Sequence, residues 1–218
     1  MKQVLVFGFI SLFALTGCKS TVQDAYFNMW EKIGFEKREI LVDRVEDAQE
    51  SQQEAQEQFA SALEEFSTLI NFDGGELEEV YGSLNDQFEA SQESAQDVTD
   101  RIDKVQNVAE SLFREWAEEI ELISNANLKR DSARQMKETQ RKYDGLLRSM
   151  RKVEGSMQPV LTALQDNVLY LKHNLNANAI GALQGELSTI KRDVNVLLKE
   201  MNAAISQSDE FIKTLQSE

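Results

Sequence analysis

The chain of 218 residues carries 23 Lys and Arg against 38 Asp and Glu, a formal net charge of −15 at pH 7. Such a surface repels nucleic acid and anionic membrane faces, so the composition excludes nucleic acid as a partner and favours a cationic partner or a simple need for solubility. One cysteine, Cys18, and one histidine, His173, exclude disulfides and a multi-histidine metal site within one chain, and the single proline permits long uninterrupted helices.

Residues 1–17 have the layout of a secretory signal peptide. Lys2 supplies a positive start, and an apolar run over residues 4–15 follows it. At about 1.5 Å per helical residue this run covers roughly 18 Å, well short of a hydrocarbon core of about 30 Å. The segment is therefore predicted to direct export rather than to remain as a membrane span.

The residues Leu15-Thr16-Gly17-Cys18 close this segment and resemble the lipobox of bacterial lipoproteins. The resemblance implies cleavage before Cys18, diacylglycerol on its sulfur and a third acyl chain on the new amino terminus. Two or more acyl chains hold a protein stably on a membrane, whereas one does so only marginally. An ordinary signal peptide with a chance cysteine is the alternative.

The residue after the cysteine bears on which membrane holds the protein. In the lipoproteins that this segment resembles, Asp at that position favours retention in the inner membrane. Lys19 stands there instead. The prediction is therefore a periplasm-facing anchor in the outer membrane, with the inner membrane as the less favoured location.

After a short tether at residues 18–23, apolar residues recur at alternating spacings of three and four, the period of amphipathic helices. The predicted helices cover about residues 24–70, 76–124, 128–174 and 180–216. Asp24 is a suitable N-cap for the first, and two glycines after Asp73 mark the first turn. Several Asn residues and Gly181 favour a break between the last two helices; one long helix through residues 174–181 is the alternative.

The predicted fold is all-α, an elongated antiparallel bundle or coiled coil of three to four long helices, forming a single domain over residues 24–218. We call the line of apolar residues along one face of a predicted helix a seam. The first seam runs from Leu41 to Leu69 and is broken only by Gln52, and the second runs from Leu77 through Ile102 to Trp116. The third predicted seam consists of Met136, Tyr143, Leu147, Met150, Met157, Leu161, Leu164, Val168, Leu171 and Leu175. Seams of this length can pack against other helices of the same chain or against helices of a second chain, so a homo-oligomer is an alternative to a monomer.

The third predicted helix differs from the first two in charge. Acidic residues dominate the first two helices, whereas residues 129–152 contain nine Lys and Arg. Because two acidic helices side by side repel each other, we expect the basic helix to pack alongside them and neutralise part of their field. A solvated basic face and a binding surface for an acidic partner are the alternatives.

No motif of known chemistry occurs in the chain. There is no glycine-rich phosphate loop, no Gly-x-Ser-x-Gly and no His-Glu-x-x-His. Asp73-Gly74-Gly75 lacks the spaced oxygen ligands of a calcium loop. We therefore expect no catalytic, metal-binding or cofactor-binding residues and no enzyme activity.

An amide-rich run near the end of the third helix is the most unusual polar segment. We predict a recognition patch formed by Tyr170, Lys172, His173, Asn174 and Asn176. The alternative is a helix end, or a buried polar network that fixes helix register as a single Asn does in coiled coils.

Three stretches carry a resemblance to a known family: residues 37–45 (Lys-Arg-Glu-Ile-Leu-Val-Asp-Arg-Val), 71–75 (Asn-Phe-Asp-Gly-Gly) and 169–177 (Leu-Tyr-Leu-Lys-His-Asn-Leu-Asn-Ala). From about residue 24 to 216 the chain resembles uncharacterised lipoproteins of the bacterial cell envelope, known only as a domain of unknown function. The resemblance implies an all-helical, coiled-coil-rich periplasmic protein. It supplies no activity and no catalytic residues.

These observations favour a lipid-anchored helical scaffold or protein-interaction module, held to the membrane by acyl chains on Cys18 and bound to a periplasmic protein. The alternative is a periplasmic bundle that binds a lipid or another hydrophobic ligand between its helices. Small residues in the first seam, such as Ala48 and Ala55, argue for closed packing instead.

Overall fold

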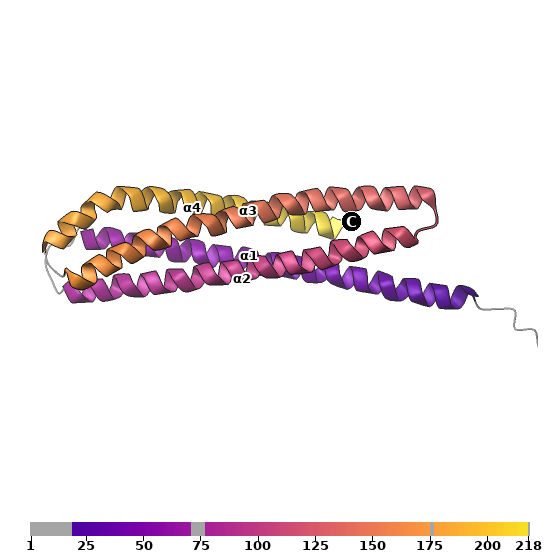
Figure 1. Cartoon of the computed structure of the whole chain (residues 1–218), viewed down its shortest axis with the longest axis horizontal. Coiled ribbons are helices and arrows are strands. Elements are labelled where there is room, and N and C mark those ends of the chain that lie inside the picture. Colours follow the sequence, from indigo (N-terminus) through magenta and orange to yellow (C-terminus); the bar gives the residue numbers. More distant parts are fainter. Residues whose placement is uncertain (1–18, 71–76, 175–176, 218) are drawn as a thin grey trace, which may run out of the picture.

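The computed structural model describes the backbone of residues 19–70, 77–174 and 177–217, and the side chains of residues 37–70, 78–79, 81–174 and 180–216. Within these ranges the chain forms four helices and no strand: α1 (Lys19–Ile70), α2 (Leu77–Leu122), α3 (Ala126–His173) and α4 (Ala177–Ser217) (Figure 1). The predicted all-α class and the bundle of long helices are confirmed.

Asparagines mark both ends of α3. The side-chain oxygen of Asn125 accepts hydrogen bonds from the backbone N–H groups of Asn127 and Leu128, at 2.9 and 3.3 Å, and so caps the first turn. Asn174 ends the helix, and α4 begins at Ala177. The predicted break is confirmed, and the alternative of one long helix through residues 174–181 is wrong.

The start of α1 differs from the prediction. The helix begins at Lys19 rather than at Asp24, so residues 19–23, predicted to be a tether before the helix, belong to its first turns. None of these residues is Gly or Pro, so nothing in them stops a helix. Cys18 and the predicted signal peptide lie outside the described residues.

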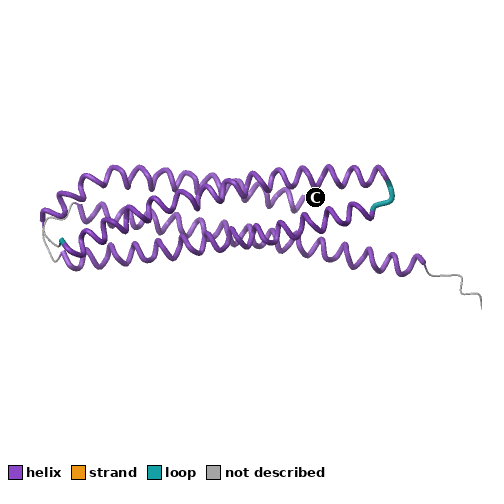
Figure 2. Tube along the Cα trace, viewed as in Figure 1, coloured by secondary structure: helices purple, strands orange, loops and turns teal. Residues whose placement is uncertain are grey.

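The four helices lie lengthwise along one common axis (Figure 2), and their contacts form a closed ring in chain order. α1 and α3 each pack against both α2 and α4. In the described residues no pair of Cα atoms within 8 Å joins α1 to α3 or α2 to α4. Consecutive helices run in opposite directions, as the sequence colours of Figure 1 show. The bundle is therefore antiparallel, with α1 and α3 diagonally opposed.

The two ends of the bundle differ in the chain segments that they hold. The first residues of α1 and the α2–α3 connection lie at one end, where α1 extends past the connection and α4 stops short (Figure 1). We call this the N-terminal end. The last residues of α1 and α3 and the first residues of α2 and α4 lie at the other end, which we call the far end. Because α1 has 52 residues, it spans about 78 Å.

The first predicted seam is confirmed as core. Its members are at most 1 % exposed: Leu41, Val45, Ala48, Gln52, Ala55, Phe59, Ala62, Phe66 and Leu69. Burial of a large aliphatic or aromatic side chain contributes about 1.5–3 kcal/mol, so seams of this kind hold the bundle together.

The third predicted seam is confirmed in part. Seven of its ten residues are buried: Tyr143, Met150, Met157, Leu161, Leu164, Val168 and Leu171. Met136 and Leu147 are only partly buried, and Leu175 lies outside the described residues. The other buried residues of α3 were absent from the prediction: Thr139, Leu146, Val153, Val160 and Asn167. The buried face of α3 is therefore wider than the predicted seam, and packing against α2 and α4 selects Leu146 over its apolar neighbour Leu147.

Four buried polar side chains in the core are satisfied within their own helices. Ser51, Ser91, Ser208 and Asn167 each donate a hydrogen bond to a carbonyl three or four residues earlier. Gln52 is 0 % exposed, and neither atom of its amide has a hydrogen-bond partner in the described structure. This amide is therefore a local cost to the stability of the bundle.

Candidate functional site

The residue predicted to carry lipid, Cys18, lies outside the described residues and directly precedes α1. The part of the chain that the structure describes contains no helix that is both long and apolar enough to cross a membrane.

The predicted recognition patch lies at the far end, where α3 ends. Its described members are Tyr170, Lys172 and His173, which are exposed, and Asn174, which is half-buried. The fifth, Asn176, lies outside the described residues. Leu169, beside the patch, is 50 % exposed. The far end therefore presents a polar and aromatic surface with an apolar neighbour.

Asn174 caps the C-terminal end of α3. Its backbone N–H donates to the carbonyl oxygen of Leu171 at 3.0 Å, and its side-chain N–H donates to the carbonyl oxygen of Tyr170 at 2.9 Å. These bonds satisfy carbonyl groups that the end of a helix leaves free. A helix end thus accounts for Asn174, while Tyr170, Lys172 and His173 stay available at the surface.

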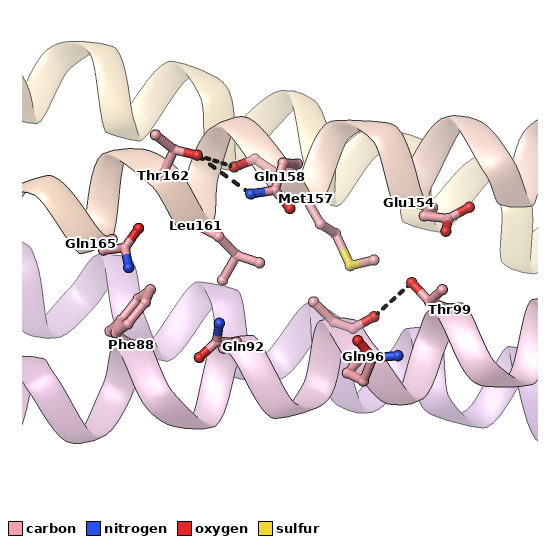
Figure 3. A pocket seen from close by; sticks show the side chains of 11 residues that line it. Phe88, Gln92, Gln96, Thr99, Glu154, Met157, Gln158, Leu161, Thr162 and Gln165 are labelled. Atoms are coloured by element: carbon pink, nitrogen blue, oxygen red, sulfur yellow. Dashed lines mark hydrogen bonds between the residues drawn. The ribbon is translucent and has the colours of Figure 1, made fainter.

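A wide shallow groove runs between α2 and α3 (Figure 3). Its volume is about 320 Å³, and amide side chains rim it from both helices: Gln92, Gln96, Gln158 and Gln165. Phe88 and Leu161 supply apolar surface, and the one charged lining residue, Glu154, is paired with Arg151 at 2.9 Å. This groove offers hydrogen-bonding surface but no nucleophile and base in contact.

The charged surfaces are distributed differently from the prediction. Residues 45–100, which include the end of α1 and the first half of α2, contain 16 Asp and Glu and no Lys or Arg. The basic helix α3 does not pack against α1, so the expected neutralisation of α1 by α3 is wrong: ring closure in chain order puts them on a diagonal. Its ion pairs with α2, Arg151–Asp103 at 2.6 Å and Lys129–Glu121 at 2.8 Å, lie outside that acidic segment.

Specific polar contacts join three helices near the N-terminal end. Lys37 forms an ion pair with Glu115 across α1 and α2. The indole N–H of Trp116 donates to the hydroxyl of Ser132 on α3 at 3.0 Å, and the guanidinium of Arg38 lies 4.9 Å from the Trp116 ring centre. Trp116 therefore anchors α1, α2 and α3 to one another, as its predicted core position indicates.

An aromatic cluster of Phe113, Tyr143 and Phe211 lies in the core between α2, α3 and α4. The ring of Tyr143 lies 5.5 Å from that of Phe113 and 6.1 Å from that of Phe211, between centres. The Tyr143 hydroxyl is buried without a hydrogen-bond partner in the described structure. Burial, and then the charges of Glu110 and Asp144, raise the pKa of Tyr143 to about 12.

Replacement of Tyr143 by Phe is expected to make the bundle more resistant to alkali. In the wild type this hydroxyl ionises near pH 10 when unfolded and near pH 12 when folded, so its contribution is fully present below pH 10 and is lost as the pH rises to 12. Urea unfolding at pH 8 and pH 11 should show a smaller loss of stability for Tyr143→Phe than for the wild type. Tyr170→Phe, at an exposed position, is the control. Equal losses of stability in Tyr143→Phe and the wild type would contradict the raised pKa of Tyr143 in the folded protein.

The described residues contain no group of three or more His, Cys, Asp or Glu side chains that could hold a metal ion. Neither the curated proteins nor the solved structures include a match to this chain. A family model described as "Protein of unknown function (DUF2959)" matches residues 26–215. This match covers most of the chain and all four helices. The chain therefore belongs to the DUF2959 family of proteins of unknown function.

Proposed function

We propose that the protein is a lipid-anchored scaffold or interaction module of the bacterial envelope, held in the outer membrane and facing the periplasm. The observation that carries the proposal is the direct continuity between Cys18 and α1, which begins at Lys19. An acylated Cys18 holds the N-terminal end of the bundle at the membrane without an intervening flexible segment. The far end then stands about 70–80 Å away if the rod is upright.

The distribution of surfaces supports a role in binding rather than in chemistry. The patch of Tyr170, Lys172 and His173 lies at the far end, opposite the first residues of α1. The acidic segment of residues 45–100 extends toward the same end and favours a cationic partner there. A rigid rod with its binding surfaces remote from the anchor suits a protein that reaches a partner across the periplasm.

A carrier of lipid or another hydrophobic ligand is the second candidate. It requires an apolar space between the helices. The first seam is closed to within 1 % exposure from Leu41 to Leu69, and small residues such as Ala48 and Ala55 bring the helices close together. Native mass spectrometry that detects a co-purified lipid on the Cys18→Ala protein would favour this candidate over the scaffold.

Replacement of Cys18 by Ala is expected to remove the protein from the membrane. Without the sulfur there is no site for acyl chains, and the acidic surface of the rod does not hold it on an anionic membrane. Cell fractionation and labelling with a radioactive fatty acid measure the effect, with Ser20→Ala as the matched control. A Cys18→Ala protein that stays membrane-bound would refute the anchor.

Replacement of Lys19 by Asp tests the outer-membrane assignment. If that assignment is right, Lys19→Asp moves the protein toward the inner membrane.

The interaction role is tested in the same cells. A photo-crosslinking amino acid at Tyr170 is expected to give a discrete product with another envelope protein, and the product should weaken with Lys172→Glu. The same amino acid at Lys104, exposed on α2 away from the far end, is the control. The absence of any product at Tyr170 would count against display of a binding surface at the far end.

A further inference from the structure

Two grooves of opposite charge lie on the two sides of α4 near the N-terminal end. The first, between α3 and α4, consists of two adjoining hollows of about 450 and 430 Å³ that share Gly145 and Gln207. Its cationic lining residues are Arg141, Lys142, Arg148 and Lys152. We call it the basic groove.

Small side chains make the basic groove hollow. Gly145 has no side chain, and a Cβ placed there would meet only the Arg148 guanidinium, at 4.0 Å. Ala203 faces the same space from α4, and the buried side chains of Leu146 and Phe211 close one of the two hollows. The cations therefore rim a depression rather than lie on a flat helix face.

Part of the positive charge in the basic groove has no partner. Lys152 pairs with Glu200 at 3.0 Å, and the ammonium of Lys142 donates to the hydroxyl of Thr214 at 3.1 Å. Arg141 and Arg148 form no ion pair within the described part of the chain. The lining holds four cations against two carboxylates, Glu200 and Glu210, so the groove is positive in a chain whose net charge is −15.

The second groove, between α1 and α4, has a volume of about 600 Å³. Its carboxylates are Glu39, Asp43 and Glu46, none of which forms an ion pair with any other described residue. Its one cation, Arg38, lies over the ring of Trp116. We call it the acidic groove; Val42 and Leu215 give it an apolar strip.

The two grooves open on adjacent faces of the bundle, because α4 lies between α1 and α3 in the ring. They reach the same height near the end of α4, where Thr214 lines the basic groove and the next residue, Leu215, lines the acidic one. The second hollow of the basic groove lies farther back along α4, at Glu200, Ala203 and Gln207. A second copy that stands parallel to the first and is turned about the rod axis therefore presents its acidic groove at the level of Arg141 and Lys142 of the first.

We propose that the basic groove of one molecule binds the acidic groove of a second, parallel copy. The two surfaces differ, so the contact is heterologous, and because they lie on adjacent faces each added copy is turned about the rod axis relative to the last. Such a contact closes into a ring when the turns add up to a full circle and otherwise continues as an open chain. Each exposed ion pair contributes little, so the contact is weak in dilute solution and sensitive to salt. The lipid anchor of the proposed function aligns the molecules and raises their local concentration, and the inference rests on that function for the parallel arrangement.

An anionic membrane surface fits the basic groove less well. α3 lies diagonally opposite α1, the helix that follows Cys18. A rod lying with α3 on the membrane would hold its anchored helix on the face turned away from the lipid. The second copy has no such conflict, because both molecules stand on the same membrane.

The test uses the full chain in membranes, prepared as a mixture of copies with natural-abundance and heavy nitrogen. A zero-length reagent that couples carboxylates to lysines is expected to join Lys142 or Lys152 of one copy to Asp43 or Glu46 of another, giving mixed-isotope peptides. Such peptides should be lost above about 0.5 M salt. Their absence at low salt overturns the proposal.

Charge reversal separates this contact from other anionic ligands. Arg141→Glu/Arg148→Glu and Asp43→Lys/Glu46→Lys are each expected to lower co-purification of two differently tagged copies at least about tenfold, because like charges then meet. Mixing the two variants, or combining all four changes in one chain, should restore it. Lys104→Glu/Lys191→Glu makes the same change in net charge as the basic-groove variant, at exposed positions outside both grooves and outside the far-end patch, and should have no effect.

Two results contradict the self-association. If only the basic-groove variant loses co-purification and mixing does not restore it, the groove binds some other anionic partner. If the basic-groove variant instead loses binding to vesicles of anionic phospholipid while co-purification is unchanged, the groove binds membrane. Circular dichroism checks that each variant folds, and membrane fractionation of the same samples shows separately whether the anchor holds.

Discussion

Replacement of Ile102 by Asp is expected to lower the melting temperature by about 10–20 °C at pH 7. Ile102 is 0 % exposed in the core. The substitution removes about 2–5 kcal/mol of apolar packing and adds about 1–3 kcal/mol for a buried carboxyl without a partner. A domain of this size loses roughly 2–4 °C per kcal/mol, and whole domains are stable by only about 5–15 kcal/mol. Thermal unfolding followed by circular dichroism measures the effect.

The loss should be smaller at low pH. Burial raises the pKa of the introduced carboxyl above its unfolded value, so the group destabilises most where it is ionised when unfolded and least below that value. Lys104→Asp, two residues along α2 at an exposed position, brings in the same carboxyl and should change stability by no more than about 0.5 kcal/mol. Equal melting temperatures for both variants would show that the second seam is not core.

Replacement of Gln52 by Leu is expected to raise the free energy of unfolding by about 1–3 kcal/mol, the cost of a buried amide with no hydrogen bond. Gln52 interrupts an otherwise apolar seam of α1 at 0 % exposure, and both polar atoms of its amide lack a partner in the described structure. Leu has a similar volume and no polar atom, so it fills the same space without that cost. Urea unfolding of the Cys18→Ala protein measures the difference without the complication of lipid.

The neighbouring residue supplies the control. Gln53 is exposed, and Gln53→Leu should leave stability within about 0.5 kcal/mol of the wild type. A loss of stability in Gln52→Leu would mean that the amide has a partner, such as a buried water. A gain in stability combined with faster hydrogen exchange in the core would instead assign Gln52 a role in fixing helix register, as buried amides have in coiled coils.

The two grooves follow from the uneven distribution of charge along this chain. Acidic residues fill the segment 45–100, and basic residues concentrate at 129–152. If the bundle had placed α3 between α1 and α2, the positive charges of α3 would have neutralised part of the negative charge of the other two helices inside the molecule. The ring in chain order leaves α3 with exposed cations on one side of α4 and α1 with exposed carboxylates on the other. Lateral association is a direct use of that separation.

The sequence was sufficient to predict the helices, because the residues that specify each helix lie close together in the chain. Apolar spacing, the two glycines after Asp73 and the amide-rich run before Ala177 predict the elements to within a few residues, except that α1 starts five residues before the predicted position. The full buried face of α3 was harder to predict. Adjacent apolar pairs such as Leu146 and Leu147 satisfy two helical stripes equally well, and Thr139 and Asn167 lie in the true seam although they are polar.

By itself the sequence determined the helical class, the lengths of the helices, the first two seams and the position of the patch on α3, since each depends on residues close together in the chain. Only the tertiary structure decided which helices touch. Four antiparallel helices can close a bundle in more than one order, and exposed charges contribute too little to choose among them. Short connections and apolar packing set the order, and with it the diagonal placement of α1 and α3 and the two grooves on adjacent faces of the bundle.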